Sequence, residues 1–411
     1  MMRGRMHQGN AMNMNRTPSR RGGFKPNQKT FVPHVTFDII QCENLFQRVK
    51  PPTDDKMFTE ALLKKVQELT PNAKTQASVL SLVTSVQTVL DNLVIASGTF
   101  DAAVVDEVRQ VGNHKKGTLL SGDNVAEIVV VLKTLPTFEA VQSLSNKVYQ
   151  DMMVSSPREA FGATLNECGF EITNHEAVSR VYVTTIPPNF KFLDASLHLD
   201  SKMMEGHLLS IRRTRWFEEN ACHSTVKVLV RLLSDLRNRF QGFQPLTPWI
   251  IDVFSHYCVM VNPQRTPLSI NIAIRRCLQL LSSGFFLPGS QGIFDPCADK
   301  PNVRVHTVMS MEQQDQVCFT AQTLLRVLSH GGFMYLLGFK KNLDIVNDVT
   351  LWNGVVVTPS EKAYEKEDET NMANSAAAGT ADTTAASATA QPIFGDDMVA
   401  VNSAATAMTS S

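Results

Sequence analysis

The sequence predicts a mixed α/β subdomain followed by an all-α subdomain, with a disordered tail at each end of the chain. In the first half, runs of β-branched residues alternate with apolar stripes at helical spacing, which indicates a small mixed sheet with flanking helices. From about residue 195 onward the apolar patterns have helical spacing. Both ends lack the apolar bulk needed to order themselves. The regions we expect are a basic arm over 1–30, the α/β subdomain over 31–194, the helical subdomain over 195–366 and a tail over 367–411.

The elements of the α/β subdomain follow from local start and stop signals. Prolines and acids precede an apolar stripe that begins with Phe58, and Pro71 suits the first turn of a second helix. Pro187 ends the last strand, because proline cannot donate to a sheet ladder. In chain order we expect a helix over 51–69, a helix from Pro71 to about Ile95, strands over 106–112 and 126–132, a helix capped by Thr137, and strands over 170–173 and 179–186.

The helical subdomain is predicted from stripes whose ends are marked by glycine and proline, as in GFQPLTP and FFLPGSQG. Each stripe repeats apolar residues at three- and four-residue spacing, which places them on one face of a helix. We expect helices over 208–220, 224–240, 248–261, 269–284 and 311–332.

Composition narrows the class of protein. Lys plus Arg and Asp plus Glu each number 39, so the chain is formally neutral and a globally basic nucleic-acid binder is not indicated. The 7 cysteines include no Cys-x-x-Cys pair, which favours free thiols in a reducing compartment over a disulfide framework or a zinc site. No apolar run approaches the roughly 20 residues that span a bilayer, and the N-terminus does not resemble a secretory signal. We therefore expect a soluble intracellular protein with no membrane partner.

The basic arm over 1–30 contains no acid, and it includes Arg3, Arg5, Arg16, Arg20 and Arg21. Arginine contacts phosphates and stacks on bases, so contact with nucleic acid is one interpretation. A flexible solubilising arm and a nuclear localisation signal are the alternatives, and the sequence leaves them open. The opposite tail follows an acidic Glu-Lys-Glu-Asp-Glu-Thr run and continues in Ala, Thr, Ser and Asn.

One loop has the composition of a phosphate-binding segment beside a strand that presents metal ligands. The loop begins at Gly112 and contains Lys115, Lys116, Gly117 and Thr118. Its lysines, its threonine and the backbone N–H groups around the second glycine can contact a nucleotide triphosphate. In the alternative interpretation, this glycine serves only the turn and the lysines face solvent.

The strand after this loop lacks the acids that nucleotidyl transfer requires. Two metal ions are held by carboxylates at positions i and i+2 of one strand and by a third carboxylate on a neighbouring strand. Here Glu127 occupies the second position, Val125 the first, and the neighbouring strand offers only Thr184 and Thr185. We therefore expect a body that has lost catalysis. The alternative is an active template-free nucleotidyltransferase that uses Glu127 together with the loop residue Asp123.

The residues from Gly112 to Val130 are similar to the signature of the template-free nucleotidyltransferases, in which a Gly-Ser loop precedes an Asp-x-Asp strand. Asn113 stands where that signature has serine, and Val125 where it has the first aspartate. Longer segments resemble one branch of this group, the DZF family ("domain associated with zinc fingers"), over roughly 31–366. These segments are FVPHVTFDI, NLVIASGTF, EVRQVGNHKKGT, RTRWFEENA, FQGFQPLTPWI, FFLPGSQGI, RVHTVM, LLRVLSHGGF and VTPSEKAYEK.

The resemblance implies a nucleotidyltransferase-like α/β subdomain and a helical subdomain that supplies a pairing surface. It implies a heterodimer with a larger DZF protein that carries double-stranded-RNA-binding domains. The pair would act in the nucleus in transcription and in RNA processing and stability, with RNA and also DNA bound mostly through the partner. Smaller members of the family are catalytically silent, so no cofactor and no metal are expected. The tail over 367–411 departs from the long acidic C-terminus that the resemblance leads us to expect.

Four aromatic residues are candidates for the pairing surface. Trp216 and Phe217 lie among arginines at the end of a predicted helix, and Phe285 and Phe286 end another. Aromatic residues and arginine are enriched at protein interfaces. The alternative is burial of such residues in the local cores. A sequence-specific DNA-binding factor is a third functional class, but no helix-turn-helix, zinc finger or basic zipper is visible.

Overall fold

The computed structural model describes residues 55–263 and 265–363. The predictions for the basic arm over 1–30, the segment over 31–54 and the tail over 367–411 lie outside the described residues.

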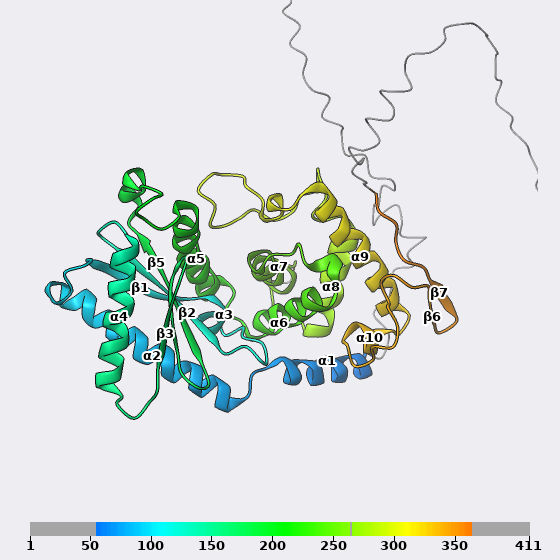
Figure 1. Ribbon diagram of the computed structural model, residues 1–411. Coiled ribbons are helices and arrows are strands. Elements are labelled where there is room, and N and C mark those ends of the chain that lie inside the picture. The colour runs from blue at the N-terminus through cyan, green and yellow to red at the C-terminus, as the bar shows by residue number, and fades with distance from the viewer. Residues whose placement is uncertain (1–54, 264, 364–411) are drawn as a thin grey trace, which may run out of the picture. The chain divides into compact units, whose positions relative to one another are not determined.

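The α/β subdomain is built on a five-stranded mixed sheet with the strand order β1-β2-β5-β4-β3 (Figure 1). β2 pairs antiparallel with β1 and parallel with β5, and β4 and β3 continue the sheet antiparallel beyond β5. Most of β2 is buried, which accounts for its continuous β-branched run. The strands are β1 (Val105–Val111), β2 (Val125–Leu132), β3 (Gly162–Asn166), β4 (Gly169–Thr173) and β5 (Val178–Thr185).

The mixed sheet and its predicted strands are confirmed, and edge strand β3 is an addition to them. The side chains of β3 are almost all exposed, so the strand carries no buried alternation that a sequence could reveal. Its partner β4 has the buried residues Phe170 and Ile172, and these made β4 predictable.

Helices cover both faces of the sheet. α2 (Ala73–Ile95) and α4 (Phe138–Ser155) pack on one face, and α5 (Ser201–Asn220) packs on the other (Figure 1). The side chains of β2 alternate between these faces: Ile128 lies in the core beneath α2 and α4, whereas Val129 points toward α5. We call the cluster beneath α2 and α4 the sheet core.

The helix ends of this subdomain are set by side-chain caps. The Thr137 hydroxyl accepts a hydrogen bond from the Ala140 N–H at 3.1 Å, as predicted for the start of α4. α2 begins two residues later than predicted, because the Asn72 side chain, and not Pro71, marks its start by accepting from the Thr75 N–H at 2.8 Å.

By length and composition, α2 passes the test for a membrane-spanning helix, which the sequence-based expectation did not anticipate. Its most apolar window has a mean hydropathy of 1.5, and 39% of that window is buried inside the protein. Its buried residues belong to the sheet core, so its apolar face is already used by the sheet.

The all-α subdomain that was predicted is also confirmed, and it surrounds one large cluster of buried residues that we call the helical core. A two-stranded hairpin follows its last helices. The elements of this subdomain are α6 (Ser224–Arg239), α7 (Pro248–Met260), α8 (Ile270–Ser282), α9 (Met311–Ser329), α10 (Phe333–Leu336), β6 (Thr350–Trp352) and β7 (Val355–Val357). It also contains the short helices η4 (Gln241–Phe243) and η5 (Val305–Val308). The short helices of the α/β subdomain are η2 (Ser97–Thr99), α3 (Gly112–Lys116) and η3 (Pro187–Phe192).

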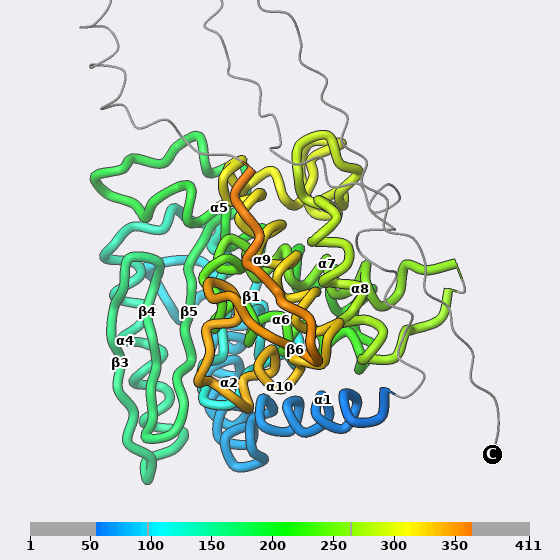
Figure 2. The backbone as a smooth tube through the Cα atoms, turned by 90° about the vertical axis from the view of Figure 1, so that its right-hand side faces the viewer, coloured from blue at the N-terminus to red at the C-terminus, as the bar shows by residue number. Residues whose placement is uncertain are grey.

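The first helix, α1 (Lys56–Leu69), packs with the helical subdomain although it precedes the sheet in the chain (Figures 1 and 2). Its Phe58 and Leu62 are buried in the helical core. Asp55, just before the helix, accepts a hydrogen bond at 2.7 Å from Arg275 of α8. Two segments far apart in the sequence therefore build this side of the helical core.

α5 joins the two cores. Met204, near its N-terminus, is buried in the sheet core, and Phe217, near its C-terminus, is buried in the helical core. The chain thus passes from one subdomain to the other inside a continuous helix, and this helix lies beside the loop that the sequence singled out.

Candidate functional site

The predicted phosphate loop is a one-turn helix closed by a glycine. α3 starts at Gly112, and Gly117 ends it in the left-handed region with φ 71°. The Gly117 N–H donates to the His114 carbonyl at 3.0 Å, and the Thr118 N–H donates to the Asn113 carbonyl at 2.8 Å. These two N–H groups are therefore satisfied within the loop, and they do not point to an outside anion.

Glu127 is partly buried and contacts the loop and β5. The Tyr182 hydroxyl donates to Glu127 Oε1 at 3.0 Å, and the other carboxylate oxygen lies against Gly112. A Cβ atom on Gly112 would approach Glu127 Oε2 to 1.6 Å, so a side chain at this position would require the Glu127 carboxylate to move away from the loop. Glu127 of β2 is thus the side chain through which the strand contacts the start of the loop at Gly112.

The ring of Tyr182 is itself covered on the α5 side. His207 stacks on it with 4.3 Å between ring centroids. Burial and the neighbouring Glu127 carboxylate raise the pKa of Tyr182 to about 12, so the phenol stays protonated and remains a donor. Burial lowers the pKa of His207 to about 4, so this imidazole is neutral at pH 7.

The sheet register places a cation beside Glu127 on β5. Glu127 is in register with Arg180, and in a parallel pair such residues share a face of the sheet. The Arg180 guanidinium donates to Glu171 of β4 at 2.6 Å, which raises its pKa. The β5 side chain that reaches Glu127 is Tyr182, two residues beyond Arg180, and the position of a third carboxylate at Thr184 and Thr185 stays a prediction.

Thr184 and Thr185 lie four and five residues beyond Arg180 on β5, and their hydroxyls donate hydrogen bonds to backbone carbonyls. The Thr184 hydroxyl donates to the Met204 carbonyl of α5 at 2.9 Å, and the Thr185 hydroxyl donates to the Leu132 carbonyl at 2.9 Å. Asp123 lies in the loop before β2, where its carboxylate accepts the Leu120 N–H at 3.3 Å. Across the residues that the structure describes, no three His, Cys, Asp or Glu side chains are grouped to hold a metal ion.

Lys116 of the loop is buried and ion-paired. Its Nζ lies 2.6 Å from Asp252 Oδ2 of α7, and the two side chains are only 8% and 4% exposed. The ammonium also lies 5.5 Å above the ring of Phe217. Burial raises the pKa of Asp252, and the nearby Lys116 charge opposes that rise. The interpretation in which both lysines face solvent is therefore wrong for Lys116.

The other contacts of the loop also lead to the helices. Lys115 Nζ lies 3.1 Å from Glu218 Oε1 of α5. Arg231 of α6 donates to the Gly117 carbonyl at 2.8 Å and to the Leu119 carbonyl at 2.9 Å. Three helices thus hold the loop through charged side chains, and its two lysines both have carboxylate partners.

The aromatic candidates for a pairing surface divide into core residues and partly buried ones. Phe217 and Phe286 are 0% and 2% exposed in the helical core, so the prediction that they form a surface is wrong. Phe217 lies in α5 and Phe286 in the turn that follows α8, and both rings are packed in the helical core, where their large apolar area is removed from water. Trp216 packs edge-on against Trp249 at 5.3 Å, and Phe285 lies 5.2 Å from the Tyr257 ring; both are partly buried.

Asp252, Arg231 and Tyr182 are among the residues of this arrangement that were not identified from the sequence. Asp252 had a usable signal, because a lone acid inside the strongly apolar PWIIDVF helix requires a buried partner. Arg231 and Tyr182 had none, because arginine in a helix and tyrosine in a strand are ordinary in sequence.

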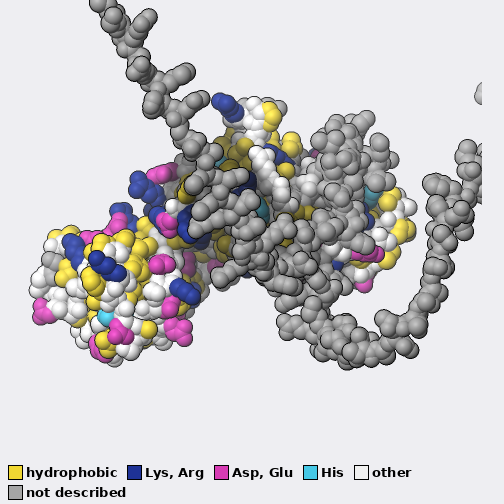
Figure 3. Space-filling model, turned by 90° about the horizontal axis from the view of Figure 1, so that it is seen from above, with side chains coloured by type: hydrophobic (Ala, Val, Ile, Leu, Met, Phe, Trp, Pro, Cys, Tyr) yellow, Lys and Arg dark blue, Asp and Glu magenta, His cyan; other side chains and the backbone are white. Residues whose placement is uncertain are grey.

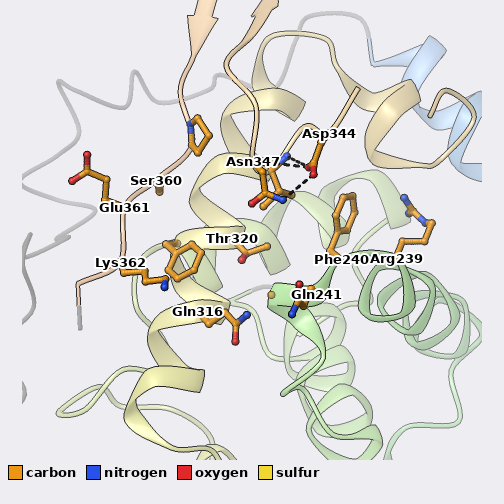
Figure 4. Close-up of a pocket in the computed structure, with 14 residues that line it drawn as sticks. Arg239, Phe240, Gln241, Gln316, Thr320, Asp344, Asn347, Ser360, Glu361 and Lys362 are labelled. Atoms are coloured by element: carbon orange, nitrogen blue, oxygen red, sulfur yellow. Dashed lines mark hydrogen bonds between the residues drawn. The ribbon is translucent and has the colours of Figure 1, made fainter. Parts of the chain in front are cut away.

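A cavity of about 740 Å³ lies away from this site. It is bordered by η4, α9 and the segment over 359–362 (Figure 4). Its charged lining is mixed, with Arg239 and Lys362 facing the same space as Asp344 and Glu361. No residue of the predicted loop lines it. On the coloured part of the face seen in Figure 3, basic and acidic side chains are likewise interspersed.

Comparison with solved structures finds distant likenesses. One is CdnC in a complex with HORMA-deltaN from E. coli MS115-1, with 11% identity and a TM-score of 0.47 over 68% of this chain and 94% of that chain. Another is the Cid1 poly(U) polymerase, with 11% identity and a TM-score of 0.42 over 67% of this chain and 95% of that chain. A cytoplasmic RNA terminal U-transferase has 10% identity and a TM-score of 0.37 over 55% and 70%.

Family models cover the body of the chain. The DZF N-terminal domain matches residues 14–222, which include the sheet, the loop and α5. The DZF C-terminal domain matches residues 225–358, which run from α6 through the hairpin. The junction between the two models follows α5, the helix that joins the sheet core to the helical core. The chain belongs to the DZF family.

Proposed function

We propose that this chain is a non-catalytic DZF protein, a degenerate nucleotidyltransferase that serves as a pairing scaffold. It forms a heterodimer with a larger DZF protein that carries double-stranded-RNA-binding domains. The pair acts in the nucleus, where it regulates transcription and RNA processing and stability. In this role the chain corresponds to the smaller subunit type of the family, represented by interleukin enhancer-binding factor two.

The observation that carries the non-catalytic part is the set of contacts around Glu127. A two-metal centre needs at least one further acid at coordination distance from the first. Glu127 accepts from Tyr182 on one oxygen and lies against Gly112 with the other, and its register neighbour on β5, Arg180, is paired with Glu171. Among the described residues no three His, Cys, Asp or Glu side chains are grouped around a possible metal position, which supports a structural role for this carboxylate.

The loop supports the same proposal. A phosphate-binding loop presents free N–H groups and free cations to its ligand. Here Lys115 and Lys116 are paired with Glu218 and Asp252, and the N–H groups of Gly117 and Thr118 are bonded within the loop. The loop residues that would hold a nucleotide connect the sheet to the helices instead, and their contacts stabilise the fold.

Nucleic-acid contact by this chain is assigned to the arm over 1–30, and most of the affinity is assigned to the partner. The arm contains arginines and no acid, so its contacts are electrostatic and tolerant of sequence. On the coloured part of the face in Figure 3, basic and acidic side chains are interspersed. Binding by the pair should therefore weaken steeply with salt, and removal of residues 1–30 should reduce the slope of that dependence.

Pairing is tested by the mass of the purified chain, alone and after co-expression with a larger DZF protein, measured by light scattering during size-exclusion chromatography. A stable one-to-one complex is expected. A monomer that ignores such partners at micromolar concentration would refute the scaffold function.

Catalysis is tested separately, with labelled nucleoside triphosphates, an RNA primer and Mg²⁺ or Mn²⁺. No incorporation above background is expected, while an active terminal transferase in the same buffer serves as the positive control. Incorporation that disappears in the Glu127→Gln variant would show that the chain is an enzyme after all.

A further inference from the structure

The hairpin of β6 and β7 is a small, separate sheet at the end of the helical subdomain (Figure 2). Its strands pair antiparallel, with Leu351 opposite Val356. Asn353 and Gly354 form the turn with φ angles of 48° and 82°, the left-handed pair that a two-residue hairpin needs. The turn therefore sets the register of the hairpin and the direction in which each side chain points.

The inner face of the hairpin is fixed to the helical subdomain. Val357 and Thr350 are 1% and 5% exposed. The Trp352 ring packs edge-on against Tyr335, with 5.0 Å between centroids. At the tip, Asn353 Nδ2 donates to the His330 carbonyl at 2.9 Å. The hairpin is thus held at its base and at its tip, which makes it a preorganised platform.

The outer face of the hairpin is apolar, against the usual pattern. A sheet with one face in water normally alternates apolar and polar side chains. Here the outward positions Val349, Leu351 and Val356 are 64%, 67% and 63% exposed. Among the described residues the two strands pair only with each other, so neither outer edge is extended by another described strand.

We infer that this outer face binds the corresponding hairpin of the partner's DZF C-terminal domain. This inference rests on the pairing proposed above, and it names the surface through which the pairing occurs. The C-terminal family model ends at residue 358, one residue after β7, so the hairpin belongs to the domain that a DZF partner also carries. Two related domains that meet through the same surface form an isologous contact, in which each copy presents what the other binds.

The apolar outer face of the hairpin fits another hairpin better than it fits nucleic acid. An apolar sheet face is matched by another apolar sheet face, and open strand edges are matched by open strand edges. Nucleic acid is not matched, because the three outward side chains carry no charge and cannot contact phosphates. Three side chains bury less area than a stable interface needs, so the hairpin pair is one part of a larger contact between the helical subdomains.

The test uses the full chain and a full-length larger DZF protein, with the dissociation constant measured by titration. The variants are Leu351→Glu and Val356→Glu, each of which places a charge on the outer face without touching the buried one. The matched control is Val154→Glu, at an 80% exposed position of α4 in the α/β subdomain. Circular dichroism and thermal unfolding establish that each variant is folded.

We expect each hairpin variant to weaken the complex at least about tenfold, and the control to leave it unchanged. Wild-type affinity in both folded hairpin variants would overturn the hairpin contact and leave the proposed heterodimer intact. Failure of the wild-type chain to bind the partner would overturn the proposed function, and the hairpin contact with it. Equal weakening in Val154→Glu would mean a general effect of charge, and would also overturn the inference.

Discussion

Lys116 Nζ lies 2.6 Å from Asp252 Oδ2, although the two residues are 136 positions apart in the chain. The lysine belongs to the loop after β1, and the aspartate lies in the apolar helix α7 of the helical subdomain. A buried charge without its partner is far more costly than a paired one. The pair therefore holds the loop in place, and it accounts for a lysine that resembles a phosphate ligand in the sequence.

Removal of either member of this pair should destabilise the protein strongly. Lys116→Met leaves Asp252 buried without its counter-ion, and we expect a loss of about 3–5 kcal/mol in the free energy of unfolding, measured by urea denaturation. The Lys116→Met/Asp252→Leu double variant should recover most of this loss, because no charge then remains buried. Lys115→Met, which breaks the more exposed pair with Glu218, should cost less than about 1 kcal/mol. Equal losses for the two lysines would contradict this account.

Gly112→Ala should destabilise the protein through Glu127 as well as through the backbone. It places a Cβ atom 1.6 Å from Glu127 Oε2 and also puts a residue with a side chain at φ 72° in the left-handed region. We expect a loss of about 1–3 kcal/mol, from the backbone strain and from displacement of the Glu127 carboxylate, which would break its hydrogen bond with Tyr182.

Two further variants separate these causes. Gly122→Ala has a φ of 94° and no atom within 4 Å of the new Cβ, so it reports the backbone strain alone, at about 1 kcal/mol. The Gly112→Ala/Glu127→Ala variant should recover the steric part and retain the strain. If Gly112→Ala cost no more than Gly122→Ala, the contacts of the Glu127 carboxylate with the loop and Tyr182 would contribute nothing to stability.

Stability should fall in mild acid through His207. Its pKa is lowered from 6.5 to about 4 by burial, so the unfolded chain binds a proton between these values and the folded protein does not. The contribution of this group to stability is therefore complete above pH 6.5 and is lost as the pH falls toward 4. Because the ring is partly exposed, we expect a loss of only about 1–2 kcal/mol. Chemical denaturation of the wild type and of His207→Leu at a series of pH values measures it, and parallel pH curves would contradict the expectation.

Phe217 should behave as a core residue and not as an interface residue. Phe217→Ala should lower the free energy of unfolding by about 3–5 kcal/mol, because a large side chain at 0% exposure leaves a cavity. The folded fraction should still bind the partner with unchanged affinity. Met57→Ala, at a 73% exposed position of α1, is the control and should change stability by less than about 0.5 kcal/mol. A loss of partner binding without a loss of stability would place Phe217 at the interface.

The sequence predicted the elements whose apolar residues recur with a strong helical or strand period. The β-branched run of β2, the cap of α4 by Thr137 and the helical stripes of the second half all report burial or capping within a few residues of themselves. Elements with weak periodicity were missed. β3 is exposed, and the hairpin of β6 and β7 is only three residues long on each side, although its Asn353-Gly354 turn is a recognised hairpin signal.

The sequence by itself determined which residues stand at the two strand positions where a nucleotidyltransferase would need carboxylates, because that spacing is local: Val125 occupies one and Glu127 the other. Only the tertiary structure decided which side chains surround Glu127 and the loop. The hydroxyl that covers Glu127 comes from Tyr182, and the carboxylate that pairs with Lys116 comes from Asp252. These partners are brought together by sheet register and helix packing, which depend on burial across the whole molecule and leave no mark in the neighbouring sequence.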